Sequence, residues 1–571
     1  MTALLTDNLP LLAGAPNGIK KLRELILELA VRGKLVPQDP SDEPATELLK
    51  RIAEKKARLL AEGKIKKQNS LAEISDEEEP FELPAGWLWT RLGEICLTQT
   101  GTTPSKSQPE LFGSDVPFIK PGDIYPNKVD YNGESLSSLG ASQSGRIAQA
   151  GSLLMVCIGT IGKCNLIDRD CSFNQQINSA TLYKGLPQYL KIAGRSPYFQ
   201  AKTWSESSST TIAILNKGKW EAIPLPLPGI AEQHRIVAKV DELMALCDRL
   251  EAQQADAESA HAQLVQALLD SLTQASDATD FAASWQRLAE HFHTLFTTEF
   301  SIDTLKQTLL QLAVMGKLAP QDPNDEPANK LLGRIVSDRQ QLANEGRFKK
   351  QKNLTEITEE EKLFAIPKNW EWARISSFSE LKSGLAYKSE AFSEVGKNQV
   401  IRMGNIRPGM LRLETNPAFI SNDLARDTFD FSLVAGDIVL TMTGTKGKQD
   451  YMYSVLIEEK HLEKSPLFLN QRLCAIRAQY INQKFLTLIL QDQRLLDPIF
   501  RSSTGTANQA NIGMSALNNW ALPIPPLAEQ NRIVSAADQV MNICEAIKIK
   551  ISTSYNVHNL ISSALIVEGL A

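Results

Sequence analysis

The stretch Gly33-Lys-Leu-Val-Pro-Gln-Asp-Pro-Ser-Asp-Glu-Pro-Ala-Thr46 decides the fold, because the chain contains it twice. It recurs as Gly316-Lys-Leu-Ala-Pro-Gln-Asp-Pro-Asn-Asp-Glu-Pro-Ala-Asn329, with 11 of 14 positions identical at a shift of 283 residues. Further along, Ala231–Val237 recurs as Ala528–Val534 at a shift of 297, so the second copy carries 14 more residues in its middle. Such a repeat predicts two copies of one unit within the 571 residues, with similar ends and different middles.

Long helices are expected at the end of each copy. Apolar positions step by four and three for nearly five heptads from Ile236 to Leu268, and again from Ile533 to Leu565. We predict two spacer helices of about 40 residues, each roughly 60 Å long. They would pair most simply with each other in antiparallel fashion, with the two middles at opposite ends. The alternative is that each helix packs on its own domain.

Shorter elements precede and follow each middle. We expect an amphipathic helix, a Pro-rich turn and then a charged surface helix at the start of each copy. The amphipathic helices are Leu22 to Leu35 and Leu305 to Leu318, and the charged ones are Ala45 to Gly63 and Ala328 to Gly346. Pro-rich runs leave the middles at Pro224–Pro228 and Pro523–Pro526. Because proline continues neither a helix nor a central strand, these runs predict stiff joints.

Composition excludes several classes of protein. With 61 Lys+Arg against 66 Asp+Glu the net charge is −5, which is not the basic excess of a general polyanion binder. The longest near-apolar stretch, Leu153 to Gly159, is too short to span a bilayer, and the N-terminus does not resemble a signal peptide, so we expect a cytoplasmic protein without a membrane anchor. The seven cysteines form no CxxC pair, so they suggest neither a zinc site nor a disulfide framework.

The middles contain no convincing catalytic motif. There is no Asn/Asp-Pro-Pro-aromatic loop of the kind that holds a flipped adenine, and Gly159-Thr-Ile-Gly-Lys163 lacks the spacing of a phosphate-binding loop. The six histidines are scattered, so neither a Ser/His/Asp set nor a metal cluster is indicated. Nothing in the chain resembles a self-contained enzyme.

Recognition of DNA is better supported, because the middles place Arg, Lys, Asn, Gln, Ser and Thr in Gly-rich loops. Lys382 to Arg412 alone holds six basic residues and two acidic ones. The candidate contacts of the first middle are Thr102, Thr103, Ser105, Lys106, Lys120, Lys163, Gln176, Thr210, Thr211, Lys217 and Lys219. Those of the second are Lys382, Lys388, Arg402, Asn405, Arg407, Thr445, Lys446, Lys448, Arg472, Thr504, Asn508, Gln509 and Asn511. Two alternatives stay open: polar loops are often merely exposed, and Asn174–Gln176 and Asn470–Arg472 could satisfy buried backbone groups.

The order of these motifs resembles one family over nearly the whole chain. The loop Thr100–Ser105, the following Phe118–Ile124 and the exits Pro226-Leu-Pro-Gly-Ile-Ala-Glu-Gln233 and Pro525-Pro-Leu-Ala-Glu-Gln530 are similar to the specificity subunits of type I restriction-modification enzymes. Gly101-Thr102 stands where the family often has two glycines, and Lys382–Tyr387 replaces that loop in the second middle. The resemblance of individual residues is therefore weaker in the second copy.

The resemblance implies an α+β fold, in which two globular α/β target recognition domains are separated by long antiparallel coiled-coil-like helices and related by a pseudo-twofold repeat. The implied segments are a helical region and linker at 1–86, a recognition domain at 87–228, a central region at 229–369, a second recognition domain at 370–525 and a distal spacer helix at 526–571.

The function implied is that of a non-catalytic subunit that binds double-stranded DNA. Each recognition domain would read one half of a bipartite asymmetric site, while the helices set the gap and dock two modification (methyltransferase) subunits, with restriction (translocase/endonuclease) subunits bound through them. We expect no cofactor or metal in this chain; S-adenosylmethionine, ATP and Mg²⁺ would belong to the partners. The competing class is an interaction scaffold whose two domains recognise ligands other than DNA.

Overall fold

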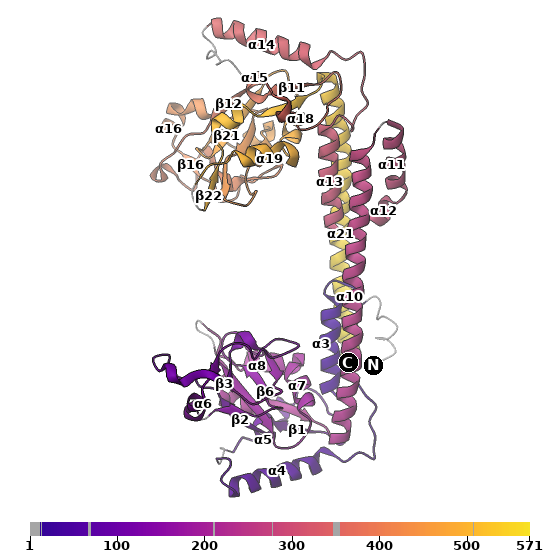
Figure 1. The fold of residues 1–571 in the computed structure, drawn as a ribbon, viewed down its shortest axis with the longest axis vertical. Coiled ribbons are helices and arrows are strands. Elements are labelled where there is room, and N and C mark those ends of the chain that lie inside the picture. The colour runs from indigo at the N-terminus through magenta and orange to yellow at the C-terminus, as the bar shows by residue number, and fades with distance from the viewer. Residues whose placement is uncertain are drawn as a thin grey trace. The chain divides into compact units, whose positions relative to one another are not determined.

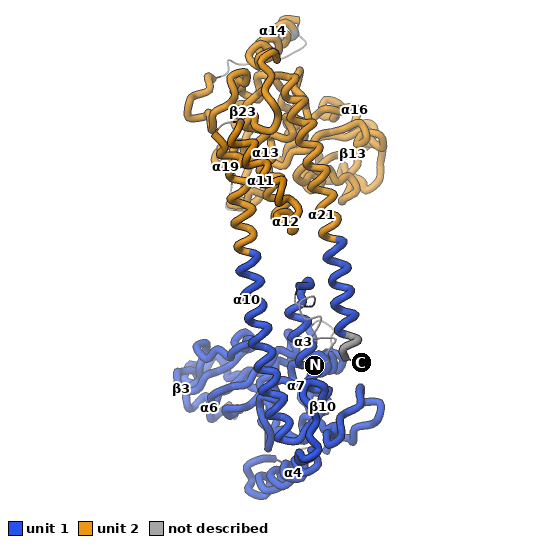
Figure 2. The backbone as a smooth tube through the Cα atoms, turned by 90° about the vertical axis from the view of Figure 1, so that its right-hand side faces the viewer, with its two compact units in different colours: residues 1–258, 553–571 blue, residues 259–552 orange. Residues whose placement is uncertain are grey.

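The computed structural model describes residues 12, 14–66, 70–144, 146–208, 212–276, 278–345, 355–505 and 508–570. The chain divides into two compact units, unit 1 with residues 1–258 and 553–571 and unit 2 with residues 259–552 (Figure 2). Each unit contains one globular domain, which we call domain 1 (residues 87–228) and domain 2 (residues 370–525). Two long helices contribute residues to both units: α10 (Ile230–Gln274) and α21 (Leu527–Leu570).

Domain 1 is built on two four-stranded sheets and a two-stranded ribbon (Figure 1). The first sheet has the order β2 (Cys96–Thr100), β9 (Ile177–Leu182), β6 (Leu153–Val156) and β7 (Cys164–Leu166). The second has the order β4 (Ser135–Leu136), β3 (Phe112–Ile119), β8 (Cys171–Phe173) and β5 (Ile147–Ala148). Its helices are α5 (Leu92–Ile95), α6 (Ser138–Ser144), α7 (Pro187–Arg195), α8 (Pro197–Ser205) and α9 (Lys217–Ala222).

Domain 2 repeats the first of these sheets and rearranges the rest. The corresponding sheet has the order β12 (Ser379–Ser383), β21 (Leu473–Ala478), β17 (Ile438–Thr441) and β19 (Ser454–Leu456). A three-stranded sheet has the order β16 (Phe419–Ile420), β13 (Asn398–Ile401) and β20 (Leu467–Leu469). Two small ribbons pair β14 (Ile406–Arg407) with β15 (Met410–Leu411) and β18 (Thr443–Thr445) with β22 (Gln509–Asn511). Its helices are α15 (Ile375–Phe378), α16 (Asn422–Asp427), α17 (Glu459–Leu462), α18 (Gln483–Ile489), α19 (Gln493–Arg501) and α20 (Met514–Asn518).

The Pro-rich exits, which were predicted as stiff joints, form strands. β10 (Pro224–Leu227) pairs antiparallel with β1 (Leu88–Arg91), and β23 (Ala521–Ile524) pairs in the same way with β11 (Glu371–Arg374). Proline is compatible with these strands because each ribbon has only two members, so every strand has one unpaired edge. The ribbons tie the entry of each domain to its exit.

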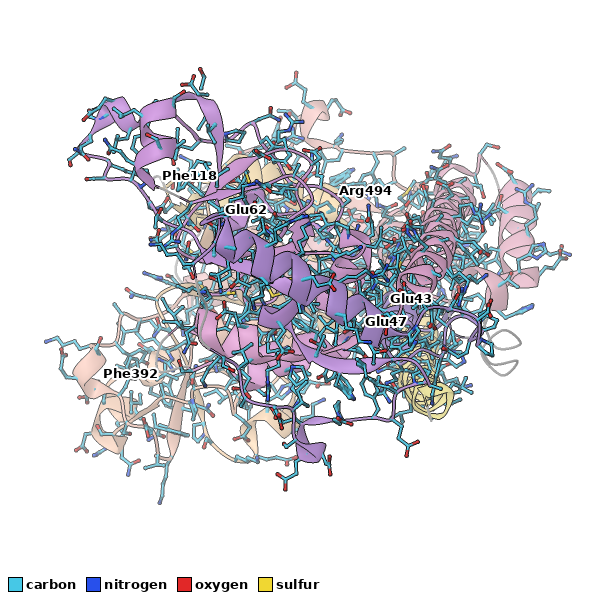
Figure 3. All side chains as sticks on the ribbon, turned by 90° about the horizontal axis from the view of Figure 1, so that it is seen from below. Glu43, Glu47, Glu62, Phe118, Phe392 and Arg494 are labelled. Atoms are coloured by element: carbon cyan, nitrogen blue, oxygen red, sulfur yellow. The ribbon has the colours of Figure 1, made fainter. Side chains whose placement is uncertain are left out.

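The shorter predicted helices are present, with earlier ends. The amphipathic helices are α3 (Gly18–Val31) and α13 (Glu299–Val314), and both end just before a glycine with positive φ, Gly33 or Gly316, which an L side chain would occupy only with strain. The charged helices are α4 (Ala45–Ala61) and α14 (Ala328–Asn344). In α4 the buried residues are Ala45, Leu48 and Ile52, and Glu47 and Glu62 lie towards its two ends (Figure 3).

The long helices are antiparallel, but their packing differs from a continuous seam. In unit 1, Ile236, Val240, Leu243 and Cys247 of α10 share a hydrophobic cluster with Leu565 and Ile566 of α21, α3 and domain 1. In unit 2, Val265, Leu269 and Leu272 of α10 cluster with Val540, Cys544, Ile547 and Ile551 of α21 and with α13. In unit 1 the first part of α10 thus packs on the last part of α21, and in unit 2 the last part of α10 packs on residues 540–551 of α21, as antiparallel pairing requires.

The predicted heptad pattern is wrong in the middle of α10. All of residues 251–260 are exposed, and Leu264, predicted as a seam residue, is 52% exposed. Where burial resumes it follows Val265 and Leu269, one position out of the predicted register. The reason is that each helix end packs in a bundle with a short helix, α3 or α13, so three-helix packing sets the buried face. A helical hairpin, α11 (Ala278–Glu290) and α12 (Phe292–Leu295), adds Trp285, Leu288 and Leu295 to the bundle of unit 2.

Among the described residues, no helix is long and apolar enough to cross a membrane.

Candidate nucleic-acid interface

A buried arginine holds each domain to its entering linker and its exit. In unit 1, Arg91 donates to the backbone oxygens of Ala72, Glu73 and Ala222 at 2.6, 2.9 and 2.5 Å, and forms a two-pronged pair with Glu78 at 3.0 and 2.8 Å. In unit 2, Arg374 makes the equivalent bonds to Thr355, Glu356 and Asn519 and to the carboxylate of Glu361. Guanidinium groups suit this role because their five donors form a fixed planar fork.

Three further contacts are duplicated where each long helix begins. The buried Glu232 accepts from Gln38 at 2.6 Å, and the buried Glu529 accepts from Gln321. Burial raises the pKa of both carboxyls. The second contact is an ion pair: Arg235 pairs with Asp42 in unit 1, and Arg532 pairs with Asp325 in unit 2. The third is made by a glutamine side chain that bonds two backbone groups. In unit 1, Gln233 bonds the backbone of Leu186 and Pro228, and in unit 2, Gln530 bonds that of Asn482 and Pro525. Like bonds at like places position the two domains on their supporting helices in the same way.

The loops of domain 2 converge on a cleft of about 340 Å³. Its lining joins the end of β12 (Ser383), the turn before β21 (Gln471 and Arg472), β18 (Thr443) and β22 (Gln509 and Asn511). The sequence predicted Arg472, Gln509 and Asn511 as separate candidates, and the fold brings them together. The cleft also includes Gln471, whose role the sequence left open, and Ser383 and Thr443, which were not candidates. Thr443 takes part through the pairing of β18 with β22, which the sequence did not show.

One hydrogen bond inside the cleft orients two of its side chains. The hydroxyl of Thr443 donates to the amide oxygen of Asn511 at 2.6 Å, which leaves the amide nitrogen of Asn511 as a donor. Glycine is required behind the cleft, because a Cβ on Gly384 would lie 2.0 Å from the backbone oxygen of Asn470. Gly101 makes the same close approach to Asn174 in domain 1, at 2.2 Å. These glycines therefore allow the backbone to pack closely against the turn before β21 in domain 2 and the turn before β9 in domain 1.

The basic loop after β18 presents its lysines outward. Thr445 donates from its backbone and from its hydroxyl to the two oxygens of Asp450, each at 2.7 Å, and these bonds lower the pKa of Asp450. Lys446 and Lys448 extend from this braced turn and are exposed. A second cavity, of about 360 Å³, lies beside it and is lined by Met403, Gly404, Arg407, Thr441, Asp450 and Tyr453. Lys388, Thr504 and Asn508 are also exposed in domain 2.

Asn405 is not suited to contact a ligand, which corrects one prediction. It is 2% exposed, and its amide nitrogen donates to the backbone oxygens of Arg412 and Thr415 at 2.9 and 2.8 Å. Its oxygen accepts from the backbone of Arg402 at 2.9 Å. The residue closes a turn, and a sequence pattern cannot separate an asparagine of this kind from one that reads a base.

Other predicted contacts are held in place by bonds within the protein. In domain 1 two lysines form ion pairs, Lys120 with Glu134 at 2.5 Å and Lys217 with Glu221 at 2.8 Å. Two others donate to backbone oxygens, Lys163 to Pro121 at 2.7 Å and Lys219 to Glu206 at 2.9 Å. In domain 2, Lys382 donates to the backbone of Asp430 and Arg402 to that of Asn416. Each of these cations already uses part of its donor capacity within the protein, and the charges of Lys120 and Lys217 are already paired, so they are weaker candidates than Lys446 and Lys448.

The loop Thr102 to Lys106 of domain 1 lies against the turn before β9. Two bonds join the loop to the turn: the hydroxyl of Thr103 donates to Gln175, and the backbone of Thr102 donates to that of Phe173 at 3.0 Å. Within the loop, Ser105 bonds with Ser107 at 2.7 Å, and Lys106 is exposed. Gln176 accepts from the nearly buried Asn174 at 3.1 Å. The Asn174 side chain therefore serves the turn itself, as one of the two alternatives predicted. Thr210 and Thr211 lie outside the described residues.

No group of three or more His, Cys, Asp and Glu side chains that could hold a metal ion occurs among the described residues. The duplicated frame of bonds and the differing polar loops are the arrangement of a protein with two binding domains.

Comparison with known proteins identifies the family. A family model described as type I restriction modification DNA specificity domain matches residues 84–258 and 367–553, one match in each copy. The EcoAI specificity subunit of Escherichia coli is 39% identical over 96% of this chain and 93% of its own length, and the EcoEI specificity subunit of the same organism is 35% identical over the same shares. The chain therefore belongs to the family of type I restriction enzyme specificity subunits.

A solved structure supports the fold alone. It is described as the structural basis of complex assembly and conformational transition of the type I R-M system, and its chain is 17% identical with a TM-score of 0.52, over 86% of this chain and 99% of that one.

Proposed function

We propose that this chain gives a type I restriction-modification complex its DNA sequence specificity, with domain 1 reading one half of a bipartite asymmetric target and domain 2 the other. The observation that carries the proposal is the contrast between duplicated frames and different recognition loops. Two domains mounted by the same bonds present different side chains, which suits a target whose halves differ in sequence. As a specificity subunit the chain is not the catalyst.

The acidic overall charge agrees with this role. A net charge of −5 disfavours indiscriminate binding along DNA, so affinity would depend on local basic loops such as Lys446 and Lys448 and on partner subunits. We assign adenine methylation, ATP-driven translocation and cleavage, with S-adenosylmethionine, ATP and Mg²⁺, to those partners. Two modification subunits would dock on the helical regions and restriction subunits through them, and the complex would work on DNA in the cytoplasm.

The assembled complex provides the test. Fluorescence anisotropy on random duplexes, followed by selection and sequencing of the bound fraction, should yield one bipartite asymmetric motif. Mapping of N6-methyladenine in the host genome should give the same motif. Absence of DNA affinity in the assembled complex at low salt would overturn the proposal in favour of a scaffold that recognises other ligands.

The spacer role of the long helices has its own test. Residues 251–260 of α10 and 553–558 of α21 are exposed, so a seven-residue insertion in both stretches leaves the packed ends unchanged. Seven helical residues add about 10 Å, equivalent to roughly three base pairs. We expect the preferred gap between half-sites to lengthen accordingly, while replacement of residues 251–257 without a change in length should leave it unaltered. An unchanged gap after insertion would exclude the spacer role.

A further inference from the structure

The cleft of domain 2 has a positional counterpart in domain 1, defined by the backbone. In domain 2, Asn511 pairs with both Thr443 and Thr504. In domain 1, Ile214 pairs with both Ile158 and Ser208. The next residue confirms the match: Leu215 donates to the backbone of Cys157 at 2.8 Å, as Ile512 donates to that of Met442 at 2.9 Å.

The segment of domain 1 that ends at Ile214 can therefore be compared position by position with β22 of domain 2, which ends at Asn511. Domain 2 has Gln509-Ala510-Asn511, and domain 1 has Ile212-Ala213-Ile214. The central alanine is less exposed than its neighbours in both domains, so the residues on either side of it point the same way. The facing residue also differs, because Thr443 of domain 2 corresponds to Ile158 of domain 1.

The chemistry of these positions is reversed between the domains. Gln509, Asn511 and Thr443 carry hydrogen-bonding groups, whereas Ile212, Ile214 and Ile158 carry only hydrocarbon. Ile212 is 58% exposed and Ile214 is 43% exposed, although isoleucine is among the residues most often buried. The turn on the other side of the cleft keeps polar residues in both domains, since Gln471 and Arg472 correspond to Gln175 and Gln176 by the register of β21 and β9.

In the major groove, the feature of a base pair that an aliphatic side chain can recognise is the C5 methyl group of thymine. We propose that Ile212 and Ile214 of domain 1 contact a thymine methyl group in its half-site, at the place where domain 2 reads a base edge by hydrogen bonds through Gln509 and Asn511. This inference rests on the proposed function, since it requires that domain 1 read DNA. It assigns specificity to residues that a search for polar base-reading side chains does not detect.

Deoxyuridine provides the test, because it differs from thymidine only by the missing methyl group and keeps the same hydrogen-bonding edge. With the assembled complex and the motif found by selection, each thymine of both half-sites is replaced singly by deoxyuridine and the Kd is measured. We expect at least one replacement to weaken binding by about fourfold, as the loss of one apolar carbon contact predicts. In Ile212→Ala and Ile214→Ala complexes the thymine and deoxyuridine duplexes should bind equally at that position.

Two further variants separate this contact from a general weakening. Ile214→Val keeps a branched hydrocarbon at the site and should keep the preference for thymine. Asn511→Ala, at the equivalent position of domain 2, should weaken binding yet retain the full difference between thymine and deoxyuridine. Both isoleucines are exposed, and circular dichroism would verify that the variants fold.

The outcomes distinguish this inference from the function beneath it. Sequence-specific binding with no effect of deoxyuridine at any thymine overturns the methyl contact and leaves the proposed function standing. The methyl contact is likewise overturned if the isoleucine variants keep the wild-type difference between the two duplexes. Failure of the assembled complex to select any motif overturns both.

Discussion

The bonds around Arg91 and Arg374 are the same in the two units, whereas the positions around Ile214 and Asn511 have opposite chemistry. The two arginines occupy equivalent positions in the two copies, and so do Ile214 and Asn511. The first pair is alike and the second is not, because the arginines hold the fold together while Ile214 and Asn511 would contact DNA. The arginines join a linker, a first strand and an exit, so a change there would weaken the attachment of a whole domain to its linker. Ile212, Ile214 and Asn511 are exposed, and substitutions at exposed positions usually change stability little, so these residues can differ between the domains.

The largest effect is expected from the frame. Arg91→Met removes donors from three backbone oxygens and from Glu78, and should lower the free energy of unfolding by about 3 kcal/mol, with Arg374→Met giving a similar loss. Denaturant unfolding and hydrogen exchange resolved by unit would measure it. Arg169→Met is the matched control, because this exposed arginine bonds its neighbour Asp168 and lies over Tyr131. A frame variant as mild as the control would contradict the role assigned to the arginines.

Gln509→Ala tests the cleft of domain 2. We expect discrimination at one base position to fall by about 1–3 kcal/mol, because a paired hydrogen-bond contact to a base edge is lost, while the rest of the motif is unchanged. Selection from a random library by the assembled complex would show it as one degenerate position. Gln341→Ala, on the exposed face of α14, is the control and should leave the motif intact. Equal weakening on cognate and scrambled duplexes would argue against base reading by Gln509.

Lys446→Ala tests the basic loop and should affect all sequences alike. Loss of one phosphate contact reduces the dependence of log K on log salt by about one and weakens binding uniformly. Anisotropy titrations between roughly 50 and 200 mM salt, a range in which such slopes are measured, give both quantities. Lys464→Ala removes an exposed lysine that pairs with Glu414 and should leave the slope unaltered. A change of base preference in Lys446→Ala would contradict its assignment to phosphate.

The smallest effect concerns pH. Pairing with Arg91 and Arg374 lowers the pKa values of Glu78 and Glu361 to about 2. A depressed carboxyl pKa stabilises the fold above the ordinary value near 4.5, and this contribution is lost as pH falls from there towards 2. The Tm of the wild type should therefore fall more between about pH 5 and 3 than that of Glu78→Gln with Glu361→Gln, by a few degrees at most because both carboxylates are partly exposed. Parallel curves for the two proteins would count against the pairing.

Much of the architecture could be predicted without coordinates. The duplicated Gly-Lys-Leu segment, the heptads and the prolines located both copies, the long helices and the joints, because these signals depend on local conformation and on periodicity. The register of α10 beyond residue 250 could not be predicted, because burial there follows a third helix. The exits were expected as stiff joints without a stated secondary structure, and they are strands of two-stranded ribbons, which leave proline an unpaired edge.

The candidate site was predicted in part. Arg472, Gln509 and Asn511 were named from residue type and do line one cleft, whereas Asn405 has the same chemistry and is buried in a turn. Lys217 and Lys382 were named for their charge, but each already has a partner within the protein. Residue type tells which bonds a side chain can form, and only its neighbours decide which bonds remain available.

By itself the sequence determined that this protein is two copies of one helical frame carrying two unlike domains, because a repeat is a property of the chain alone. The tertiary structure decided which positions of those domains correspond. Ile158 and Ile214 are far apart along the chain, and their pairing becomes visible only when two distant loops share a backbone ladder. Cross-strand partners are set by long-range register, which no local pattern encodes. That register identifies Ile212-Ala213-Ile214 of domain 1 as the equivalent of Gln509-Ala510-Asn511 of domain 2.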